Sequence, residues 1–348
     1  MPDSSNRNRA RRRPQQQPRP LRVAQGNVRK SSPAHTAFLQ LCAEEQIDIV
    51  LVQEPWLKTG PRWFHNSHPA YKIHIPLDGW NTPQTQPRVA TYIRKDSSLK
   101  VEQVRPWSSC RDILWLEIDR YTIINVYKPP VNGGYSLVTS YLLGIQPPAN
   151  TLVAGDFNAK HELWQPEITS SRNDGREIAE WATNADLTYT GEAGQPTHRE
   201  GNTIDLAFSN VPFATTIVED KLHLGADHEA LVTTLLYSRR TKVKQRRPTV
   251  AEDRLETFNG LVRISTDSLP PLPTNATADD IDTATEALLE ALAEASGAVQ
   301  KEPNGKNQNA PWWTERCREA RRDYHQARRQ GNGERKHKYF HRVIREEK

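Results

Sequence analysis

The residues of this chain that could carry out chemistry lie at the ends of short apolar segments. Asp156 and Asn158 belong to the sequence GDFNA, which directly follows the apolar run at residues 151–154. Alternate residues of an extended chain share a face. A carboxylate and an amide two positions apart can therefore address one hard cation or one phosphate oxygen. A polar turn from strand to loop would explain the same residues equally well.

Other polar residues end or interrupt similar apolar runs. Glu54 ends the run IVLVQ, and a carboxylate there is costly to bury unless it meets a cation or hydrogen-bond donors. We therefore take Glu54 as the first candidate metal ligand. Oxygen donors of this kind suit Mg²⁺ or Mn²⁺ rather than zinc. The remaining candidates are Asn27, Asn125, Tyr127, Asp205, Asp227 and His228.

His228 directly follows Asp227, and this pair has two interpretations. In the simpler one, the histidine only satisfies its hydrogen bonds beside a carboxylate. In the other, a second carboxylate at Asp205 orients the imidazole ring and keeps its proton available for catalysis.

Taken together, these groups would suit the hydrolysis of a phosphate ester. An ion held by Glu54 would polarise a phosphate, and Asp156 could take a proton from the attacking water. Asn158, Asn27 and His228 could hold the phosphoryl oxygens. The repetition of such residues on five apolar segments favours this hypothesis over five unrelated turns.

Strand-like segments outnumber helical ones in the part of the chain that carries these residues. Helical spacing of apolar residues occurs at residues 33–46, 136–143 and 176–186. Because the strands adjoin one another, the pattern favours a mixed α+β sandwich over an alternating doubly wound sheet. The strand-like runs are residues 21–28, 47–54, 71–77, 88–95, 113–119, 121–127, 150–157, 203–209, 214–220 and 229–236.

The rest of the chain divides by composition. Residues 1–20 are rich in Pro, Gln and Arg, which predicts a disordered basic arm. A domain at residues 21–237 follows, and residues 238–277 form a basic and Pro-rich linker. Residues 278–348 are predicted as a helical extension whose apolar faces have no evident partner in the sequence.

The net charge of +5 is unevenly distributed. Residues 1–22, 239–247 and 311–348 are basic, whereas residues 23–238 and 248–310 are net acidic. The basic segments could raise affinity for a polyanion without base selectivity, act as nuclear-import signals or be solvated tails. Charge alone therefore does not identify residues 23–238 as a nucleic-acid binder.

Cysteine usage and hydropathy exclude several classes of protein. Cys42, Cys110 and Cys317 are scattered, which excludes a disulfide framework or a Cys-rich zinc site and suits a reducing compartment. The longest unbroken apolar stretch, residues 49–52, is far too short to span a bilayer, so we expect no membrane insertion.

The order of the motifs resembles that of the endonuclease/exonuclease/phosphatase superfamily. GDFNAKHELW and the later SRNDGREIAEW (171–181) are most similar to the apurinic-type endonuclease domain of non-LTR, LINE-like retrotransposon polyproteins. The segment PWWTERCREARR resembles the connector to the reverse transcriptase in those polyproteins. The ordered motifs are QGN (25–27), QEPW (53–56), NVYKP (125–129), GDFNAKHELW (155–164), TIDLAFS (203–209) and ADHEAL (226–231).

The resemblance implies a four-layered αββα sandwich, the DNase I-like fold, with the site at one edge of the paired sheets. It implies a metal-dependent DNA endonuclease that nicks one strand of target DNA and leaves a 3′-hydroxyl for primed reverse transcription. Mg²⁺, or Mn²⁺, is the implied cofactor and DNA the implied partner, with the element's RNA as a second. We expect a nuclear protein with a cytoplasmic pool, and a reverse transcriptase domain that belongs to the full-length element but is absent from this chain.

The resemblance also implies a role for each candidate residue. Asp156 activates water and Asn158 helps to position it. Tyr127 contacts or orients the phosphate, and Asp205 orients His228. Alanine at position 226 is a departure, because the family often has serine before the Asp–His pair. The implied metal ligands are Glu54, Asn27 and Asp227.

Two other functions stay open. The chain could be a phosphatase or phosphodiesterase of the same superfamily that acts on lipid, nucleotide or RNA substrates. It could also be an inactive truncated remnant that serves only as a nucleic-acid-binding module. Candidate loops hold residues that could stack on bases or contact phosphates, although such aromatics also serve local packing. They are Trp56, Trp63, Trp80 and Arg172.

Overall fold

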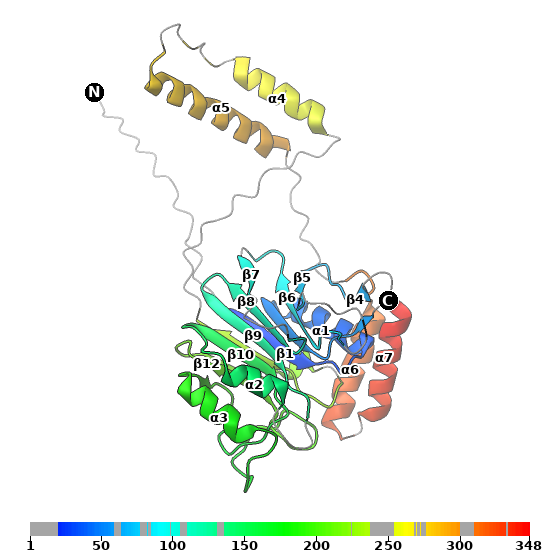
Figure 1. The fold of residues 1–348 in the computed structure, drawn as a ribbon. Coiled ribbons are helices and arrows are strands. Elements are labelled where there is room, and N and C mark those ends of the chain that lie inside the picture. Colours follow the sequence, from blue (N-terminus) through cyan, green and yellow to red (C-terminus); the bar gives the residue numbers. More distant parts are fainter. Residues whose placement is uncertain are drawn as a thin grey trace, which may run out of the picture. The chain divides into compact units, whose positions relative to one another are not determined.

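The protein folds into two compact units (Figure 1). The first comprises Met1–Thr241 with Gln308–Lys348, and the second comprises Lys242–Asn307. The computed structural model describes residues 20–58, 64–76, 85–97, 99–104, 110–130, 136–223, 225–236, 254–267, 276–299, 310–331 and 333–348, together with residues 82, 269 and 272.

Two six-stranded mixed sheets form the centre of the first unit. The strand order in the first sheet is β13-β14-β1-β2-β6-β5 and in the second β11-β12-β10-β9-β8-β7. A two-stranded sheet of β3 (Leu57–Lys58) and β4 (Phe64–His65) stands apart. The first sheet consists of β1 (Leu21–Asn27), β2 (Ile49–Gln53), β5 (Tyr71–His74), β6 (Val89–Arg94), β13 (Thr215–Val218) and β14 (Leu231–Leu235). The second consists of β7 (Val101–Val104), β8 (Ile113–Ile118), β9 (Tyr121–Tyr127), β10 (Thr151–Asp156), β11 (Thr188–Tyr189) and β12 (Asp205–Ser209).

Helices cover the outer face of each sheet (Figure 1). The first sheet is covered by α1 (Ser32–Glu44), α6 (Glu315–Arg329) and α7 (Glu334–Glu347). The second sheet is covered by α2 (Leu137–Leu143) and α3 (Gly175–Asn184). A 3₁₀ turn, η1 (Asp220–Leu222), precedes the loop to β14.

Three hydrophobic clusters fill the spaces between these layers. Leu51 and Leu152 belong to the cluster between the two sheets. Val50 points to the other face of its strand and packs with the α1 side chains. Central strands are thus buried on both faces, which explains why the sequence shows continuous apolar runs rather than strict alternation. The four layers confirm the predicted αββα sandwich.

Buried amides connect the two sheets next to the edge where the site lies. The Gln25 amide donates to the carbonyl of Gly155 at 3.3 Å. The Gln53 amide donates to Asn125 Oδ1 at 2.7 Å, and Asn125 donates to the Ala90 carbonyl at 3.0 Å. Buried polar groups need such partners, and these bonds set the distance between the sheets. Asn125, a candidate for chemistry in the sequence, serves here as an inter-sheet contact.

The C-terminal helices do not form the single extension that the division at residue 278 predicted. Residues 308–348 group with the sandwich. Trp313, Tyr324 and Phe340 lie in the same cluster as Phe38 of α1, so the apolar stripes of α6 and α7 have their partner there. Such a pairing is invisible in the sequence because the partner helix is more than 250 residues away.

The second unit contains α4 (Leu255–Asp267) and α5 (Ala278–Val299), which pack against each other. The predicted helix at residues 278–299 is therefore confirmed. None of the described helices is long and apolar enough to cross a membrane. Residues 1–19 of the predicted basic arm and the basic run at residues 239–247 lie outside the described residues.

The close approach of β10 to β9 leaves no room for a side chain at Gly155. It has a φ of +152°, and a Cβ there would lie 1.9 Å from the carbonyl oxygen of Val126. We expect Gly155→Ala to lower the free energy of unfolding in urea by about 2–3 kcal/mol, because the backbone of one strand must move. Gly144→Ala is the matched control, since its Cβ would meet only ordinary contacts at 3.5 Å and beyond. Equal losses in the two variants would contradict this explanation.

Candidate active site

The topology brings the predicted residues to one edge of the sandwich. In the second sheet, β10 runs parallel to β9 and antiparallel to β12. The register places Asp156 opposite both Tyr127 and Asp205. In the first sheet, β1 is parallel to β2, with Asn27 opposite Gln53, the residue before Glu54. Parallel strands end at the same edge, so polar residues that follow them converge.

Asp156 lies at the centre of this edge and is buried. Its carboxylate accepts hydrogen bonds from the Asn27 amide at 2.9 Å and from the backbone N–H of Asn158 at 3.0 Å. Burial and the nearby Asp205 raise the pKa of Asp156 to about 7, against the opposing effect of these bonds. A carboxyl group that titrates near neutrality can act as a general base.

His228 lies beside Asp205, as the sequence predicted. The ring Nδ1 is 2.9 Å from Asp205 Oδ2. Burial by itself lowers the pKa of His228, but the carboxylates of Asp205, Asp156 and Asp227 outweigh it and raise this pKa to about 9. The imidazole is therefore a cation at neutral pH. This geometry is the one expected if Asp205 orients the ring, and the catalytic roles of both residues stay predictions.

Glu54 and Tyr127 face each other across the gap between the sheets. The Tyr127 hydroxyl donates to Glu54 Oε1. Burial and the nearby Glu54 carboxylate raise the pKa of Tyr127, so the hydroxyl stays protonated. The guanidinium of Arg88 lies 4.9 Å from the centre of the Tyr127 ring and is held by both oxygens of Asp112. These contacts fix the ring with its hydroxyl on Glu54, and the predicted phosphate contact of Tyr127 stays a prediction.

Asp227 contacts two groups that the sequence did not suggest. Its Oδ2 lies 2.8 Å from the Arg29 guanidinium and 3.4 Å from His198 Nε2, whereas its buried Oδ1 has no hydrogen-bond partner among the described residues. Burial opposes ionisation, but His228 and Arg29 outweigh it and lower the pKa of Asp227. His198 reaches the site through a single antiparallel bridge to His228, which leaves no pattern in the sequence.

Asn158 is positioned by a lysine that the sequence reading left without a role. The Asn158 amide donates to the carbonyl oxygen of Lys128 at 3.0 Å. The Lys128 side chain is fully buried, and Nζ lies 3.6 Å from Asp174 Oδ2. Burial lowers the pKa of Lys128, which Asp174 only partly offsets. Asp174 belongs to the SRNDGREIAEW segment, so this motif contacts the site through Lys128, whose carbonyl accepts the hydrogen bond from Asn158.

Two clusters of acidic and histidine side chains could hold a metal ion in the described part of the chain. One contains Asp156, Asp205 and His228, and the other His198, Asp227 and His228, with ligand atoms within 4.8 Å of one another in each. Of the predicted metal ligands, Asp227 belongs to the second cluster. Asn27 instead donates a hydrogen bond to Asp156, and Glu54 accepts one from Tyr127. The roles of Glu54, Asn27 and Asp227 as metal ligands stay predictions.

The loop candidates for substrate contact differ in their surroundings. Trp56 is half-buried, and its backbone N–H donates to His35 Nδ1 at 3.1 Å. Arg172 is exposed, and its backbone pairs with Lys160. Trp63 and Trp80 lie outside the described residues.

Comparison with protein families supports the resemblance stated from the motifs. Residues 121–232 match a family model described as endonuclease-reverse transcriptase. The match confirms that resemblance, and the matched segment contains all the predicted catalytic residues. No curated protein matches the chain significantly. The predicted catalytic residues inside the matched segment are Tyr127, Asp156, Asn158, Asp205 and His228.

Several solved structures are similar to this chain. The endonuclease domain of TRAS1, a telomere-specific non-LTR retrotransposon, is 22% identical, with 62% of this chain and 98% of that one covered and a TM-score of 0.49. The AP endonuclease LMAP from Leishmania major is 11% identical over 63% and 89% of the two chains, with a TM-score of 0.49. An AP endonuclease from Archaeoglobus fulgidus is 13% identical over 62% and 99%, with a TM-score of 0.42.

Helix α6 braces the loop that carries His228. His223, at the start of this loop, lies 2.8 Å from the Tyr324 hydroxyl through Nε2 and 2.9 Å from Glu229 through Nδ1. Arg328 donates to the same Glu229 carboxylate at 2.5 Å. Residues on both sides of His228 are therefore held by α6, which makes the C-terminal hairpin part of the site's support.

Removal of Arg328 should loosen this loop. We expect Arg328→Ala to speed amide hydrogen exchange in residues 225–230 by about tenfold, because a charge-assisted bond to a partly buried carboxylate is lost. Arg318→Ala is the control, since within the described residues Arg318 forms an ion pair with the exposed Glu315 and with no other group. Unchanged exchange in residues 225–230 of Arg328→Ala would show that α6 does not brace the loop.

Asp205 should control the protonation of His228. In metal-free protein, Asp205→Asn removes the strongest influence that raises the pKa of His228, so this pKa should fall well below 9. The loss of positive charge would then move into the neutral pH range, as followed by NMR of the imidazole. Asp186→Asn, which changes an exposed aspartate, should leave the titration in place. A His228 pKa that is the same in both variants would contradict the assigned pairing.

Proposed function

We propose that this chain is a metal-dependent DNA endonuclease of a non-LTR retrotransposon. It nicks one strand of target DNA and leaves a 3′-hydroxyl that primes reverse transcription. The observation that carries the proposal is the constellation of Asp156, Asp205 and His228, whose ligand atoms lie within 4.8 Å of one another at the sheet edge. Glu54 and Tyr127 stand at the same edge, and the match to the endonuclease-reverse transcriptase family covers the constellation.

The protein groups have distinct parts in this hydrolysis. Asp156, with its pKa near 7, accepts a proton from the attacking water. His228 is protonated, and Asp205 occupies its Nδ1, so Nε2 is the ring atom that donates to a phosphoryl oxygen. The Asn158 amide donates to the Lys128 carbonyl, and in this proposal Asn158 helps to position the attacking water.

The donor set fits a hard divalent cation. Buried carboxylates crowd this edge, as the raised pKa of Asp156 indicates, and the buried Oδ1 of Asp227 has no partner among the described groups. Glu54, Asn27 and Asp227 would hold Mg²⁺ or Mn²⁺, both of which prefer oxygen ligands. Such an ion, when bound, supplies Lewis-acid polarisation of the scissile phosphate.

Nucleic acid is the preferred substrate on charge. Arg29, with 59% of its side chain exposed, stands at the site beside Asp227, where it can meet a backbone phosphate. The basic segments favour DNA as the partner, with the element's RNA as a second, and the arginine-rich runs support a nuclear location with a cytoplasmic pool. A phosphatase of the same superfamily and an inactive remnant are the alternatives, and the complete set of site residues counts against the remnant.

Plasmid nicking tests the enzyme, the metal and the site together. With Mg²⁺ we expect supercoiled plasmid to become open circles, and we expect EDTA to stop the reaction. Asp156→Asn and His228→Ala should each lower the rate by roughly 10²–10⁴-fold, the range for loss of acid–base catalysis. Asp186→Asn, which removes the same charge at an exposed position, should nick normally.

The alternatives give different results in the same assay. Phosphate release from small esters without any nicking would identify a phosphatase. Intact plasmid and intact esters with folded, metal-loaded protein would identify an inert module.

A further inference from the structure

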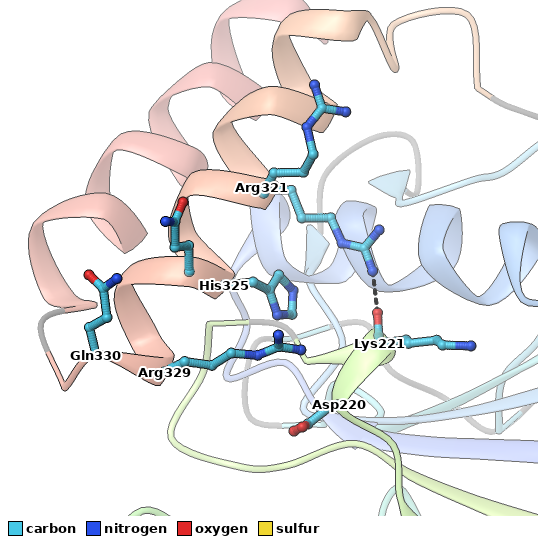
Figure 2. A pocket seen from close by; sticks show the side chains of 8 residues that line it. Asp220, Lys221, Arg321, His325, Arg329 and Gln330 are labelled. Atoms are coloured by element: carbon cyan, nitrogen blue, oxygen red, sulfur yellow. Dashed lines mark hydrogen bonds between the residues drawn. The ribbon is translucent and has the colours of Figure 1, made fainter.

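A basic cavity lies between α6 and η1, within the first unit (Figure 2). Its volume is about 470 Å³. Figure 2 shows the side chains of Arg321, His325 and Arg329 directed from α6 toward Lys221 and Asp220 of η1. Arg322 also lines the cavity, which therefore gathers four cationic groups and one imidazole around a single carboxylate, at a place that the catalytic constellation does not use.

Two residues that line this cavity each have a buried polar atom without a hydrogen-bond partner among the described residues. Arg321 Nε and His325 Nε2 are both buried without a hydrogen bond in the described part of the chain. The terminal nitrogens of Arg321 are engaged, one with the Lys221 carbonyl and the other 3.6 Å from Glu44. Orphaned buried polar atoms are rare and costly, so they indicate a missing hydrogen-bonding ligand.

The charges around the cavity indicate that this ligand is an anion. The single carboxylate, Asp220, already lies 3.3 Å from Arg328 outside the cavity lining. Arg329 is exposed, and its side chain has no ion pair within the described residues. Arg322, also exposed, forms ion pairs with Glu315 and Glu319 of its own helix and with no other group in the part of the chain that the structure describes. Burial and the nearby Arg321 lower the pKa of His325 to about 4, as expected in electropositive surroundings.

We propose that this cavity binds a backbone phosphate of nucleic acid and that the basic face of α6 is a second nucleic-acid contact surface. Phosphate oxygens accept hydrogen bonds, and guanidinium groups match their geometry. Arg328 of α6 donates a hydrogen bond to the carboxylate of Glu229, the residue after His228. This contact places the C-terminal end of α6, which carries Arg329, close to the loop of His228. The shared ligand chemistry is the sugar–phosphate backbone, which DNA and RNA both offer.

The test measures the salt dependence of binding in the full chain carrying Asp156→Asn, with labelled duplex DNA and an RNA strand of the same sequence. Arg322→Ala with Arg329→Ala removes two cations from the cavity. Each lost phosphate contact should reduce the slope of log Kobs against log salt by about 0.9 for duplex and about 0.7 for a single strand. Arg335→Ala with Arg345→Ala is the control, since both side chains are exposed on α7 and lie outside the cavity lining.

The proposal is supported if the magnitude of this slope is smaller by about 1–2 in the cavity variant than in the parent chain and is unchanged in the control. A fall with DNA identifies the flank of a DNA substrate, and a fall with RNA alone identifies an RNA strand. Equal slopes in both variants, with equal melting temperatures, would overturn it. Nicking is measured separately, in the chain that keeps Asp156. Nicking there without a change of slope in the cavity variant rejects this surface and leaves the proposed function standing, whereas a change of slope without nicking does the reverse.

Discussion

Two buried carboxylates that face each other on neighbouring strands determine how the site is built. The register of β10 and β12 places Asp156 opposite Asp205, and both are almost fully removed from solvent. Like charges in such surroundings repel each other and each loses its hydration. The protonated ring of His228 and the amide of Asn27 offset this cost. The chemistry follows from the same crowding, because it raises the pKa of Asp156 toward neutrality and keeps His228 charged.

The inter-sheet contacts keep this arrangement in place. Asn27 reaches Asp156 from the opposite sheet, so the distance between the sheets sets the length of that bond. The amides of Gln25 and Gln53 fix the distance from two sides. On the outer face, α6 holds the loop of His228 through Tyr324 and Arg328. A segment that resembles the connector to a polymerase is thus packed as part of the nuclease unit.

Much of the sandwich could be predicted from the sequence because its strands are buried on both faces. Such strands give continuous apolar runs, and Glu54, Asp156 and Asp205 stand out where charge interrupts them. The helix at residues 278–299 was likewise evident from its periodicity. The structure places every predicted catalytic residue at one sheet edge, and the separate roles of these residues stay predictions.

The contacts that the sequence did not predict depend on tertiary structure. His198 and Arg29 contact Asp227 from loops. Neither residue belongs to a periodic or motif pattern that could be recognised in the sequence. Lys128 belongs to the NVYKP motif, but its burial against Asp174 becomes visible only when two distant segments pack together. The partner of α6 and α7 was missed for the same reason. An amphipathic stripe shows that a helix face is covered without showing by what.

The most direct test of the central claim concerns the end that the reaction leaves on DNA. Plasmid nicked by the protein in Mg²⁺ should be extended by a DNA polymerase without any prior repair of its ends. In the proposed reaction water forms the new bond to phosphorus and the P–O3′ bond breaks, so the phosphate stays on the 5′ end and a 3′-hydroxyl is left. Metal-dependent nicks that accept labelled nucleotides at once are the predicted result. Plasmid that stays closed with folded protein, or nicks that need removal of a 3′-phosphate before extension, would contradict the account.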